Sequence, residues 1–288
     1  MFIVTGASGR LGRLTVQHLR ERVDAAKIVA VTRTPAEAAD LGVTVRPGDF
    51  DDPASLKQAF AGAERVLIIS TGALGRRVRQ HTAAITAAAE AGAAVLYTSM
   101  TRAGEPGNPL ALIPEHRETE RFLAGSGTPF TVLRNAVYMD MLGLTLPLRE
   151  IAGTGVLVGR HGTGFVSYVT RDDLAAATAA LLAGGGHDGQ ILELSGPQAL
   201  DHAGIAAALA AATGRPVRYD PSADEDREAL LRRLPPEVRA HGAEAAVEAG
   251  LQFWRTAAAG WFDVHTHHIP RLTGRPSTTL TEFLAATF

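Results

Sequence analysis

The chain has no cysteine, and only Lys27 and Lys57 among its 28 basic residues are lysines. The absence of cysteine excludes disulfides, thiolate metal sites, iron–sulfur clusters and a cysteine nucleophile. The near absence of lysine leaves almost no candidate for a lysine-dependent mechanism. Because the formal net charge is only −2, the composition gives no overall attraction to nucleic acid or to anionic lipid.

Long apolar runs are missing as well. Apolar stretches such as residues 174–183 are rich in alanine and well short of the roughly 20 residues that a membrane span needs. A strand-like run at 2–5 begins directly after Met1, so no signal segment is expected ahead of the fold. These features predict a cytoplasmic protein without a membrane partner.

Short apolar runs alternate with helical patterns through the first half of the chain, which predicts parallel βαβ units. The runs are continuous rather than alternating, as expected for strands that are buried on both faces. Six strands in this rhythm predict an α/β fold with a doubly wound parallel Rossmann sheet. The predicted strands are 2–5, 28–32, 43–46, 65–70, 94–99 and 130–133, and the predicted helices are 11–22, 36–41, 53–61, 76–91 and 114–124.

The rhythm changes after Asn135. A loop-rich stretch follows, and then a strand near 165–170, a helix near 171–183 and a strand at 190–194 that we expect to return to the sheet edge. Three further helices, near 201–213, 224–234 and 237–259, predict a smaller and mostly helical C-terminal lobe. The predicted division is a cofactor-binding Rossmann domain at 1–135 joined by 165–195, and a substrate lobe at 136–164 and 196–288. Ligands of open α/β sheets bind outside the carboxyl ends of the strands, so a cleft is expected between the sheet and the lobe.

A glycine-rich turn follows the first predicted strand and opens the first predicted helix. Its G-x-x-G-x-x-G spacing is the variant found in short-chain dehydrogenases. Such a turn lets backbone N–H groups approach a pyrophosphate and places that anion at a helix N-terminus. The alternative is a glycine-rich turn that binds no nucleotide. The residues predicted to bind the cofactor here are Gly6, Ala7, Ser8, Gly9, Arg10, Leu11 and Gly12.

The end of the second strand bears on the choice of cofactor. NAD-specific folds place a carboxylate there, and NADP-specific folds place a cation. Here Arg33 holds the position, and no carboxylate follows until Glu37, which predicts NADP(H) with Arg33 on the 2′-phosphate and Arg10 assisting. The alternative is that Arg33 is a solvated surface residue. After the third strand, Asp49 and Phe50 are candidates for holding adenine, unless the aspartate only caps the turn ahead of the next helix.

Several short motifs, taken together, resemble one family. The chain is similar to the NmrA-like, atypical short-chain dehydrogenases and, within them, to the type 2 NAD(P)H:quinone oxidoreductases. The resemblance spans the chain, is strongest in 1–140 and is loosest in 215–265. Besides the glycine turn, it is carried by Gly48-Asp49-Phe50-Asp51-Asp52-Pro53-Ala54-Ser55-Leu56, Leu67-Ile68-Ile69-Ser70, Tyr97-Thr98-Ser99, Glu115-His116-Arg117-Glu118-Thr119-Glu120, Leu133-Arg134-Asn135 with Tyr138, and Leu272-Thr273-Gly274-Arg275-Pro276.

The resemblance implies a position for each part of the cofactor. The turn and Arg33 would hold NADP(H), with adenine near Asp49 and Phe50, and the end of the fourth strand would pass under the cofactor. The segment from Asn135 to Tyr138 would flank the nicotinamide and a quinone. The further cofactor-binding residues predicted in this way are Ser70, Thr71, Asn135 and Ala136, with Ser99 as a weaker candidate.

The proton relay of typical short-chain dehydrogenases is absent. None of the four tyrosines is followed by lysine at the fourth position, and His116 stands where isoflavone-reductase-like relatives have a lysine. A simple ketone needs general-acid help worth roughly 10²–10⁴-fold, because a free alkoxide is very basic. A quinone yields a weakly basic hydroquinone anion, so positioning supplies most of the effect. The missing relay therefore favours a quinone-like acceptor, or no catalysis at all.

His116 and Tyr138 are the candidate catalytic residues, as proton donors to the acceptor, and for His116 a hydrogen bond to the nicotinamide ribose is the other functional option. The alternatives are that His116 is a solvated histidine paired with Glu120 at i+4, and that Tyr138 only packs in the core. The loop 139–164 and the lobe would form a mostly apolar acceptor pocket. Its candidate walls are Phe165, Trp254 and Trp261.

Two patterns suggest other functions but are weak. The run His265-Thr266-His267-His268 resembles a metal motif, yet few residues and no further ligands follow it, so no metal site is predicted. The basic residues of 76–79 open a helix without interleaved aromatics, which argues against nucleic acid.

The sequence thus predicts an NADPH-dependent oxidoreductase that passes hydride directly to a quinone or similar conjugated acceptor, without flavin or metal. Two alternatives stay open: a non-catalytic NADP(H) redox sensor that binds a protein partner, as NmrA-like regulators do, and a dedicated reductase or isomerase of secondary metabolism. The expected partner is a small quinone-like or aromatic molecule, and a homodimer is left open.

Overall fold

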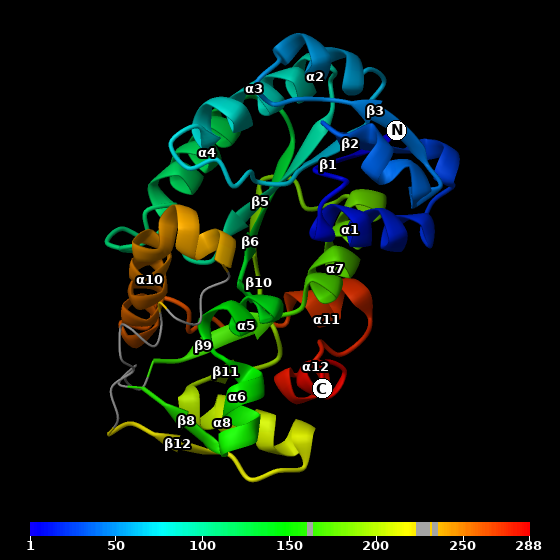
Figure 1. Ribbon diagram of the computed structural model, residues 1–288. Helices are drawn as coiled ribbons and strands as arrows, with labels where there is room; N and C mark the ends of the chain where they lie inside the picture. Colours follow the sequence, from blue (N-terminus) through cyan, green and yellow to red (C-terminus); the bar gives the residue numbers. More distant parts are fainter. Residues whose placement is uncertain (160–163, 223–230, 232–235) are drawn as a thin grey trace.

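A seven-stranded parallel sheet forms the centre of the molecule, which was analysed as a computed structural model that describes residues 1–159, 164–222, 231 and 236–288 (Figure 1). The strand order is β10-β6-β5-β4-β1-β2-β3, and every neighbouring pair is parallel. This order confirms the predicted doubly wound sheet. The strands are β1 (Phe2–Thr5), β2 (Ile28–Thr32), β3 (Thr44–Pro47), β4 (Arg65–Ile68), β5 (Ala94–Met100), β6 (Phe130–Asn135) and β10 (Gln190–Leu194).

Helices cover both faces of the sheet (Figure 1). One face carries α2 (Pro53–Ala59), α3 (Arg77–Glu90) and α4 (Ile113–Gly125), and the other carries α1 (Arg10–Arg20), α7 (Arg171–Gly184) and α11 (His268–Thr273). Every residue of β1 and β2 is buried, as expected for strands between two helical layers. Two separate apolar cores result, one on each face.

Two elements of this part differ from the sequence prediction. The expected helix at 36–41 is the 3₁₀ helix η2 (Pro35–Leu41), a common form of short connector. The fourth strand was expected to reach residue 70, but β4 ends at Ile68. It ends there because the N–H groups of Ile69 and Ser70 bind the hydroxyls of Thr5 and Thr98 instead of continuing the ladder.

The C-terminal part packs below the sheet in Figure 1 around a third apolar core. It is helical as expected, but it also holds a three-stranded sheet, β11-β9-β7, and a two-stranded sheet, β12-β8. Most of the predicted helix at 224–234 lies outside the described residues. The helices are α5 (Leu142–Thr145), α6 (Leu148–Thr154), α8 (His202–Thr213), α10 (Pro236–Ala258) and α12 (Leu280–Ala285), with η3 at Met139–Met141. The strands are β7 (Val137–Tyr138), β8 (Val156–Val158), β9 (Val166–Val169), β11 (Ala199–Leu200) and β12 (Arg218–Asp220).

The returning strand was predicted correctly, since β10 pairs with β6 at the sheet edge. Within the described ranges, no helix has both the length and the apolar character to cross a membrane.

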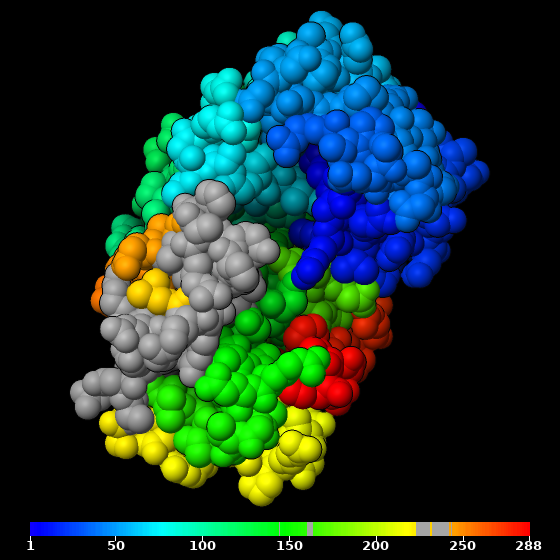
Figure 2. All heavy atoms as spheres, viewed as in Figure 1, coloured from blue at the N-terminus to red at the C-terminus, as the bar shows by residue number. Residues whose placement is uncertain are grey.

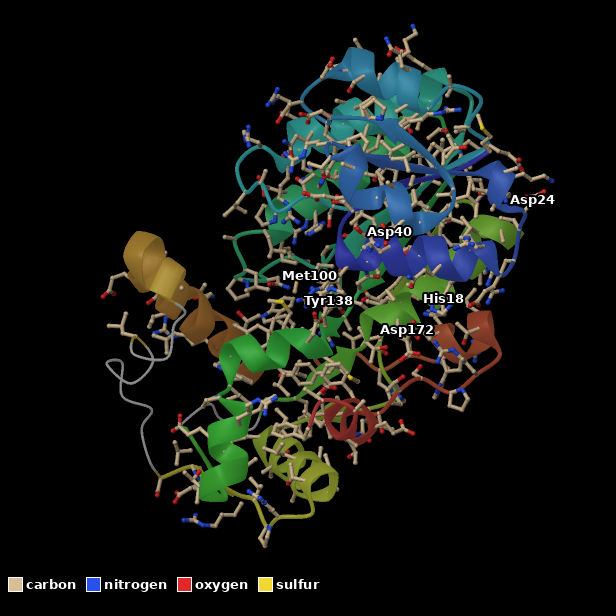
Figure 3. The ribbon with its side chains drawn as sticks, turned by 45° about the vertical axis from the view of Figure 1, so that its right-hand side comes forward. His18, Asp24, Asp40, Met100, Tyr138 and Asp172 are labelled. Atoms are coloured by element: carbon tan, nitrogen blue, oxygen red, sulfur yellow. The ribbon has the colours of Figure 1, made fainter. Side chains whose placement is uncertain are left out.

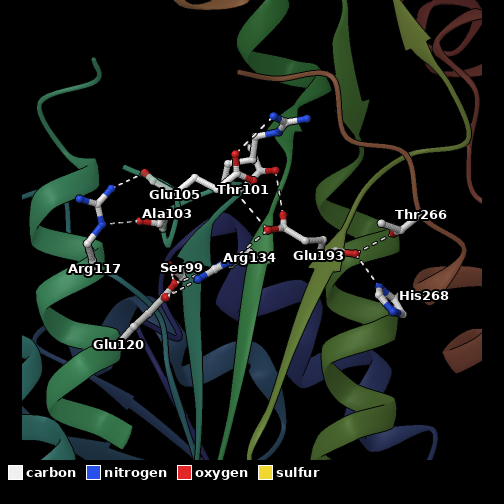
Figure 4. A network of polar contacts seen from close by, with 11 residues as sticks. Ser99, Thr101, Ala103, Glu105, Arg117, Glu120, Arg134, Glu193, Thr266 and His268 are labelled. Carbon is white, nitrogen blue, oxygen red and sulfur yellow. Dashed lines mark hydrogen bonds and ion pairs between the residues drawn. The ribbon is translucent and has the colours of Figure 1, made fainter. Parts of the chain in front are cut away.

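A buried ion network ties the carboxyl ends of the last strands together (Figure 4). Arg134 in β6 binds Glu120 of α4 at 2.7 Å and Glu193 of β10 at 3.4 Å. Burial lowers the pKa of Arg134, but the hydrogen bond and the charge of Glu120 outweigh it and raise that pKa overall. Burial raises the pKa of Glu193, although Thr101 hydrogen-bonds the carboxylate. Breaking such a pair leaves an uncompensated buried charge, which is strongly destabilising.

We expect Glu120→Gln to lower the free energy of unfolding by roughly 1.5–3 kcal/mol, because the Arg134 guanidinium would lose the nearer of its two carboxylates and keep only Glu193. Glu118→Gln is the matched control, since Glu118 is exposed on the same helix and should change stability by about 0.5 kcal/mol at most. Urea unfolding measures both. Equal effects of the two substitutions would show that the network does not stabilise the fold.

Candidate active site

The glycine turn leaves the N-terminus of α1 open. Gly6 has φ +61°, and a Cβ atom on Gly12 would overlap the carbonyl oxygen of Gly6. Gly9 is the N-cap, no side chain caps the helix, and its first turn contains no acidic residue. The free N–H groups and the helix dipole therefore favour an anion here, so the turn fits the pyrophosphate of a dinucleotide.

Arg33, at the end of β2, is exposed and has no hydrogen bond or ion pair among the described residues. Its guanidinium therefore has no partner in the described part of the chain, and its contact with the 2′-phosphate of NADP(H) stays a prediction. Next to it, the hydroxyls of Ser8 and Thr32 lie 2.8 Å apart and join the turn to β2. Arg10 extends toward the C-terminal part and binds Asp140 at 3.0 Å, although its side chain stays 80% exposed.

The Asp49 side chain accepts a hydrogen bond from the N–H of Asp51 at 3.0 Å, so it stabilises its own turn. Asp52, not Asp49, caps α2. Phe50 is half-buried, with its ring edge-on to His81 at a centroid distance of 6.5 Å. Their contact with adenine stays a prediction.

Ser70 and Thr71 lie just beyond the end of β4, where a ligand of the sheet would pass. The N–H of Ser70 binds Thr98, and the N–H of Thr71 donates to Nε2 of His81 at 3.0 Å. The hydroxyl of Thr71 donates to Gln80 at 2.8 Å. These bonds fix the shape of the loop below the predicted cofactor site.

His116 is buried, with 3% of its surface exposed. Its Nδ1 lies 2.8 Å from the Tyr97 hydroxyl, which in turn lies 3.3 Å from Nδ1 of His81. Burial, helped by the charge of Arg77, lowers the pKa of His116 and of His81 to about 3. Both imidazoles are therefore neutral at pH 7, and His116 does not serve as a cationic proton donor there. The alternative of a solvated histidine paired with Glu120 is wrong, because His116 is buried and Glu120 binds Arg134. A hydrogen bond from His116 to the nicotinamide ribose stays a prediction.

Ser99 was predicted to bind the cofactor, but its hydroxyl is buried and donates to Glu120 at 2.5 Å. It belongs to the ion network of Figure 4 and is not a free donor at the cleft. The histidine run of 265–268 also supports the fold, because Nδ1 of His268 lies 2.8 Å from the carbonyl oxygen of Glu193. No group of residues suited to a metal ion occurs in the described part of the chain.

Tyr138 lies between the sheet and the C-terminal part (Figure 3). The Arg171 guanidinium stands over its ring, 4.3 Å from the centroid, and also pairs with Asp140. Nδ2 of Asn135 donates to the Tyr138 hydroxyl at 3.3 Å, which leaves the hydroxyl proton for another acceptor. Burial raises the pKa of Tyr138, although Asn135 and Arg171 oppose it. The phenol is therefore protonated at neutral pH and can donate a hydrogen bond.

Asn135 has a buried side-chain oxygen that lacks a hydrogen-bond donor in the described part of the chain. Only 3% of the residue is exposed, and its Oδ1 has no hydrogen-bond donor in the described part. Ala136 beside it is buried, and its N–H binds Leu194. A buried unpaired oxygen is costly, so Oδ1 fits a ligand that brings an N–H or O–H group.

The predicted walls of the acceptor pocket divide into two groups. Phe165 is an exposed apolar side chain, at 42%, and stays a candidate. Trp254 is buried in the core of the C-terminal part, and Trp261 packs near Gly107. Figure 2 shows the surface hollowed between the cyan and dark-blue segments of the sheet domain.

A family model described as NAD(P)H-binding matches residues 6–184. The chain is also 36% identical to quinone oxidoreductase 2 of Escherichia coli over 294 residues, which covers 100% of this chain and 99% of that protein. The chain belongs to the NAD(P)H-binding family. The resemblance inferred from the sequence motifs is thereby confirmed.

Two solved structures of the family cover the whole chain. NADPH-dependent quinone oxidoreductase from Escherichia coli, complexed with NADPH, aligns with a TM-score of 0.87 and 34% identity over 100% of both chains. Triphenylmethane reductase from Citrobacter sp., complexed with NADP(H), aligns with a TM-score of 0.88 and 31% identity over 100% of both chains.

We expect Arg33→Glu to lower the affinity for NADPH relative to NADH by about 10- to 100-fold, the size of one or two charge-assisted hydrogen bonds. Arg22→Glu makes the same charge change at another exposed arginine and should leave the ratio unaltered. Titration calorimetry with both cofactors measures it. An unchanged ratio in Arg33→Glu would refute the role of Arg33.

The two buried histidines should make the fold acid-sensitive. Their pKa in the folded state is about 3, below the unfolded value of about 6.5, so the unfolded state binds more protons. Their stabilisation is complete above pH 6.5 and is lost as the pH falls toward 3. His116→Gln should reduce the pH slope of the unfolding free energy by about 1.4 kcal/mol per pH unit, whereas the exposed His267→Asn should not. Parallel slopes for wild type and His116→Gln would contradict this.

Proposed function

We propose that this protein is an NADPH-dependent reductase that delivers hydride to a quinone or a similar conjugated acceptor, without flavin or metal. The observation that carries the proposal is the place of Tyr138 and Asn135. A protonated phenol and an unpaired amide oxygen lie together, just past the carboxyl end of β6, where open α/β sheets bind ligands. Full-length similarity to a quinone oxidoreductase supports the acceptor class.

Each part of the site has a role in this proposal. Bound NADPH supplies the hydride. The glycine turn holds the diphosphate, Arg33 holds the 2′-phosphate, and Oδ1 of Asn135 accepts a hydrogen bond from the bound molecules. Tyr138 directs its hydroxyl proton to an oxygen of the acceptor, because Asn135 already donates to the other side of that hydroxyl.

The composition of the site suits a weakly basic product. No lysine assists Tyr138, and His116 is neutral, so the site is a poor source of protons for an alkoxide. A hydroquinone anion needs less help, and holding the acceptor in the reacting geometry accounts for most of the rate. We also propose a cytoplasmic location and no nucleic-acid partner, supported by the net charge of only −2. A homodimer stays a prediction.

Purified protein should oxidise NADPH when 1,4-benzoquinone or menadione is added. Tyr138→Phe should lower kcat by about 10- to 100-fold, the lower part of the range for general acids, with little change in NADPH affinity. Tyr219→Phe is the control, because the Tyr219 hydroxyl binds the carbonyl of Gly159 away from the site. Tight NADPH binding without turnover of any quinone would instead favour the redox-sensor alternative.

A further inference from the structure

Arg171 is a partly buried cation in direct contact with the proposed proton donor. Its guanidinium lies over the ring of Tyr138, 4.3 Å from the centroid, and only 19% of its side chain is exposed. A cation over an aromatic face is attracted by the ring electrons, and the attraction grows when water is excluded. The contact places a positive charge beside the phenol whose hydroxyl accepts a hydrogen bond from Asn135 at 3.3 Å.

Helix stability does not explain the position of Arg171. It is the first residue of α7, directly after the N-cap Thr170. The helix dipole disfavours a cation in the first turn, whereas it favours Asp172 and Asp173, which follow there. The arginine therefore opposes the stability of its own helix, and its interactions with the neighbouring segments account for its position.

Two guanidiniums share one carboxylate next to the phenol. Oδ2 of Asp140 in η3 pairs with Arg171 and also accepts a hydrogen bond from Arg10 at 3.0 Å. Oδ1 of Asp140 is buried and has no donor in the described part of the chain. Two positive charges thus face one negative charge, which leaves one positive charge in excess. A negative charge on the Tyr138 oxygen would balance it.

The other groups that act on Tyr138 point the same way. Burial raises the pKa of Tyr138, and the hydrogen bond from Asn135 and the charges of Arg171 and of Arg77 in α3 act to lower it. The carboxylate of this cluster, Asp140, is already paired with cations. The surroundings therefore stabilise an anionic oxygen on Tyr138 more than a buried position without these cations would.

We propose that Arg171 is a positioning residue that holds the Tyr138 ring and stabilises the phenolate left when Tyr138 gives up its proton. This inference rests on the proposed function and names a residue that assists the donor. Hydride transfer from NADPH, with two electrons, turns the quinone into a hydroquinone monoanion and leaves NADP⁺. The monoanion then takes the Tyr138 hydroxyl proton, the electrons of the broken O–H bond stay on the phenol oxygen, and a proton from the solvent restores the phenol.

The geometry also sets how large this help is. The guanidinium lies over the ring face, while the hydrogen bond to the hydroxyl comes from Asn135, and its charge is shared with Asp140. The stabilisation is therefore weaker than that from a cation hydrogen-bonded to the phenol oxygen. Such moderate help suits proton transfer to a hydroquinone anion, whose basicity is close to that of a phenolate, and is insufficient for an alkoxide.

The first test compares the turnover of Arg171→Met and Arg171→Lys with that of wild type. Arg171→Met should lower kcat with 1,4-benzoquinone by about 3- to 30-fold, the range of a cation–π contact, while the Kd for NADPH stays within about 2-fold. Arg171→Lys should recover part of the loss, because the cation is retained. Asp140 keeps its hydrogen bond from Arg10 in both variants, so the fold should be retained.

Arg275→Met is the matched control. Arg275 also pairs with carboxylates in the first turn of α7, but in the described part of the chain these are Asp172 and Asp173, and its side chain is 43% exposed. Its replacement should leave kcat unchanged, which separates the contact with Tyr138 from any general effect of losing an arginine at this helix end.

The titration of Tyr138 gives a second readout, which does not depend on turnover. The four tyrosines are isotope-labelled at Cζ and followed by NMR as the pH is raised, and Tyr138→Phe identifies the signal of Tyr138. Arg171→Met should move its titration to higher pH and Asp140→Asn to lower pH, because the two substitutions remove charges of opposite sign. A merely structural role of the pair would give shifts in the same direction or none.

A double-mutant cycle completes the test. In the Tyr138→Phe background, Arg171→Met should cause no further loss of kcat, because no hydroxyl proton remains to be released. The role of Arg171 is overturned by an equal loss in both backgrounds, by an unchanged titration of Tyr138, or by a loss that falls on the Kd for NADPH. Failure of the proposed function is distinguishable, because wild type would then not oxidise NADPH with any quinone, whereas the titration would still report the contact of Arg171 with Tyr138.

Discussion

The position of Arg134 between two carboxylates is the constraint on which the site depends. Its guanidinium joins α4, β6 and β10 at the carboxyl edge of the sheet. Beyond this edge the strands are no longer held together by backbone hydrogen bonds. The next residue is Asn135, and Tyr138 follows three positions later. The ion pairs of Arg134 therefore help to fix the positions of the Asn135 amide and the Tyr138 phenol. Electrostatic interactions stabilise the site in addition to apolar packing.

The charges around the site have a consistent sign. Arg171 stands over the Tyr138 ring and Arg33 is exposed at the end of β2, whereas the buried His81 and His116 are neutral at pH 7. Such a site matches ligands that bring or acquire negative charge, namely a dinucleotide phosphate and a hydroquinone anion.

The sequence predicted the sheet well and the polar contacts of the site less well. Periodicity gave the strands and their order along the chain, and the glycine spacing located the turn that opens α1. His116 was predicted as a proton donor because its position, four residues before Glu120, was visible, whereas its burial against Tyr97 was not. Nothing in the sequence indicated that Arg77 is buried, because its neighbours Arg76 and Arg79 are exposed arginines of the same helix start.

The sequence by itself determined the fold class, the glycine turn and the cation at the end of β2, because each depends on residues that are close together in the chain. Only the tertiary structure decided which ionisable groups are charged and which polar atoms lack partners. The pKa of a side chain depends on burial and on groups brought from distant segments, as when His81 of α3, Tyr97 of β5 and His116 of α4 meet in one buried cluster. No local pattern contains that information.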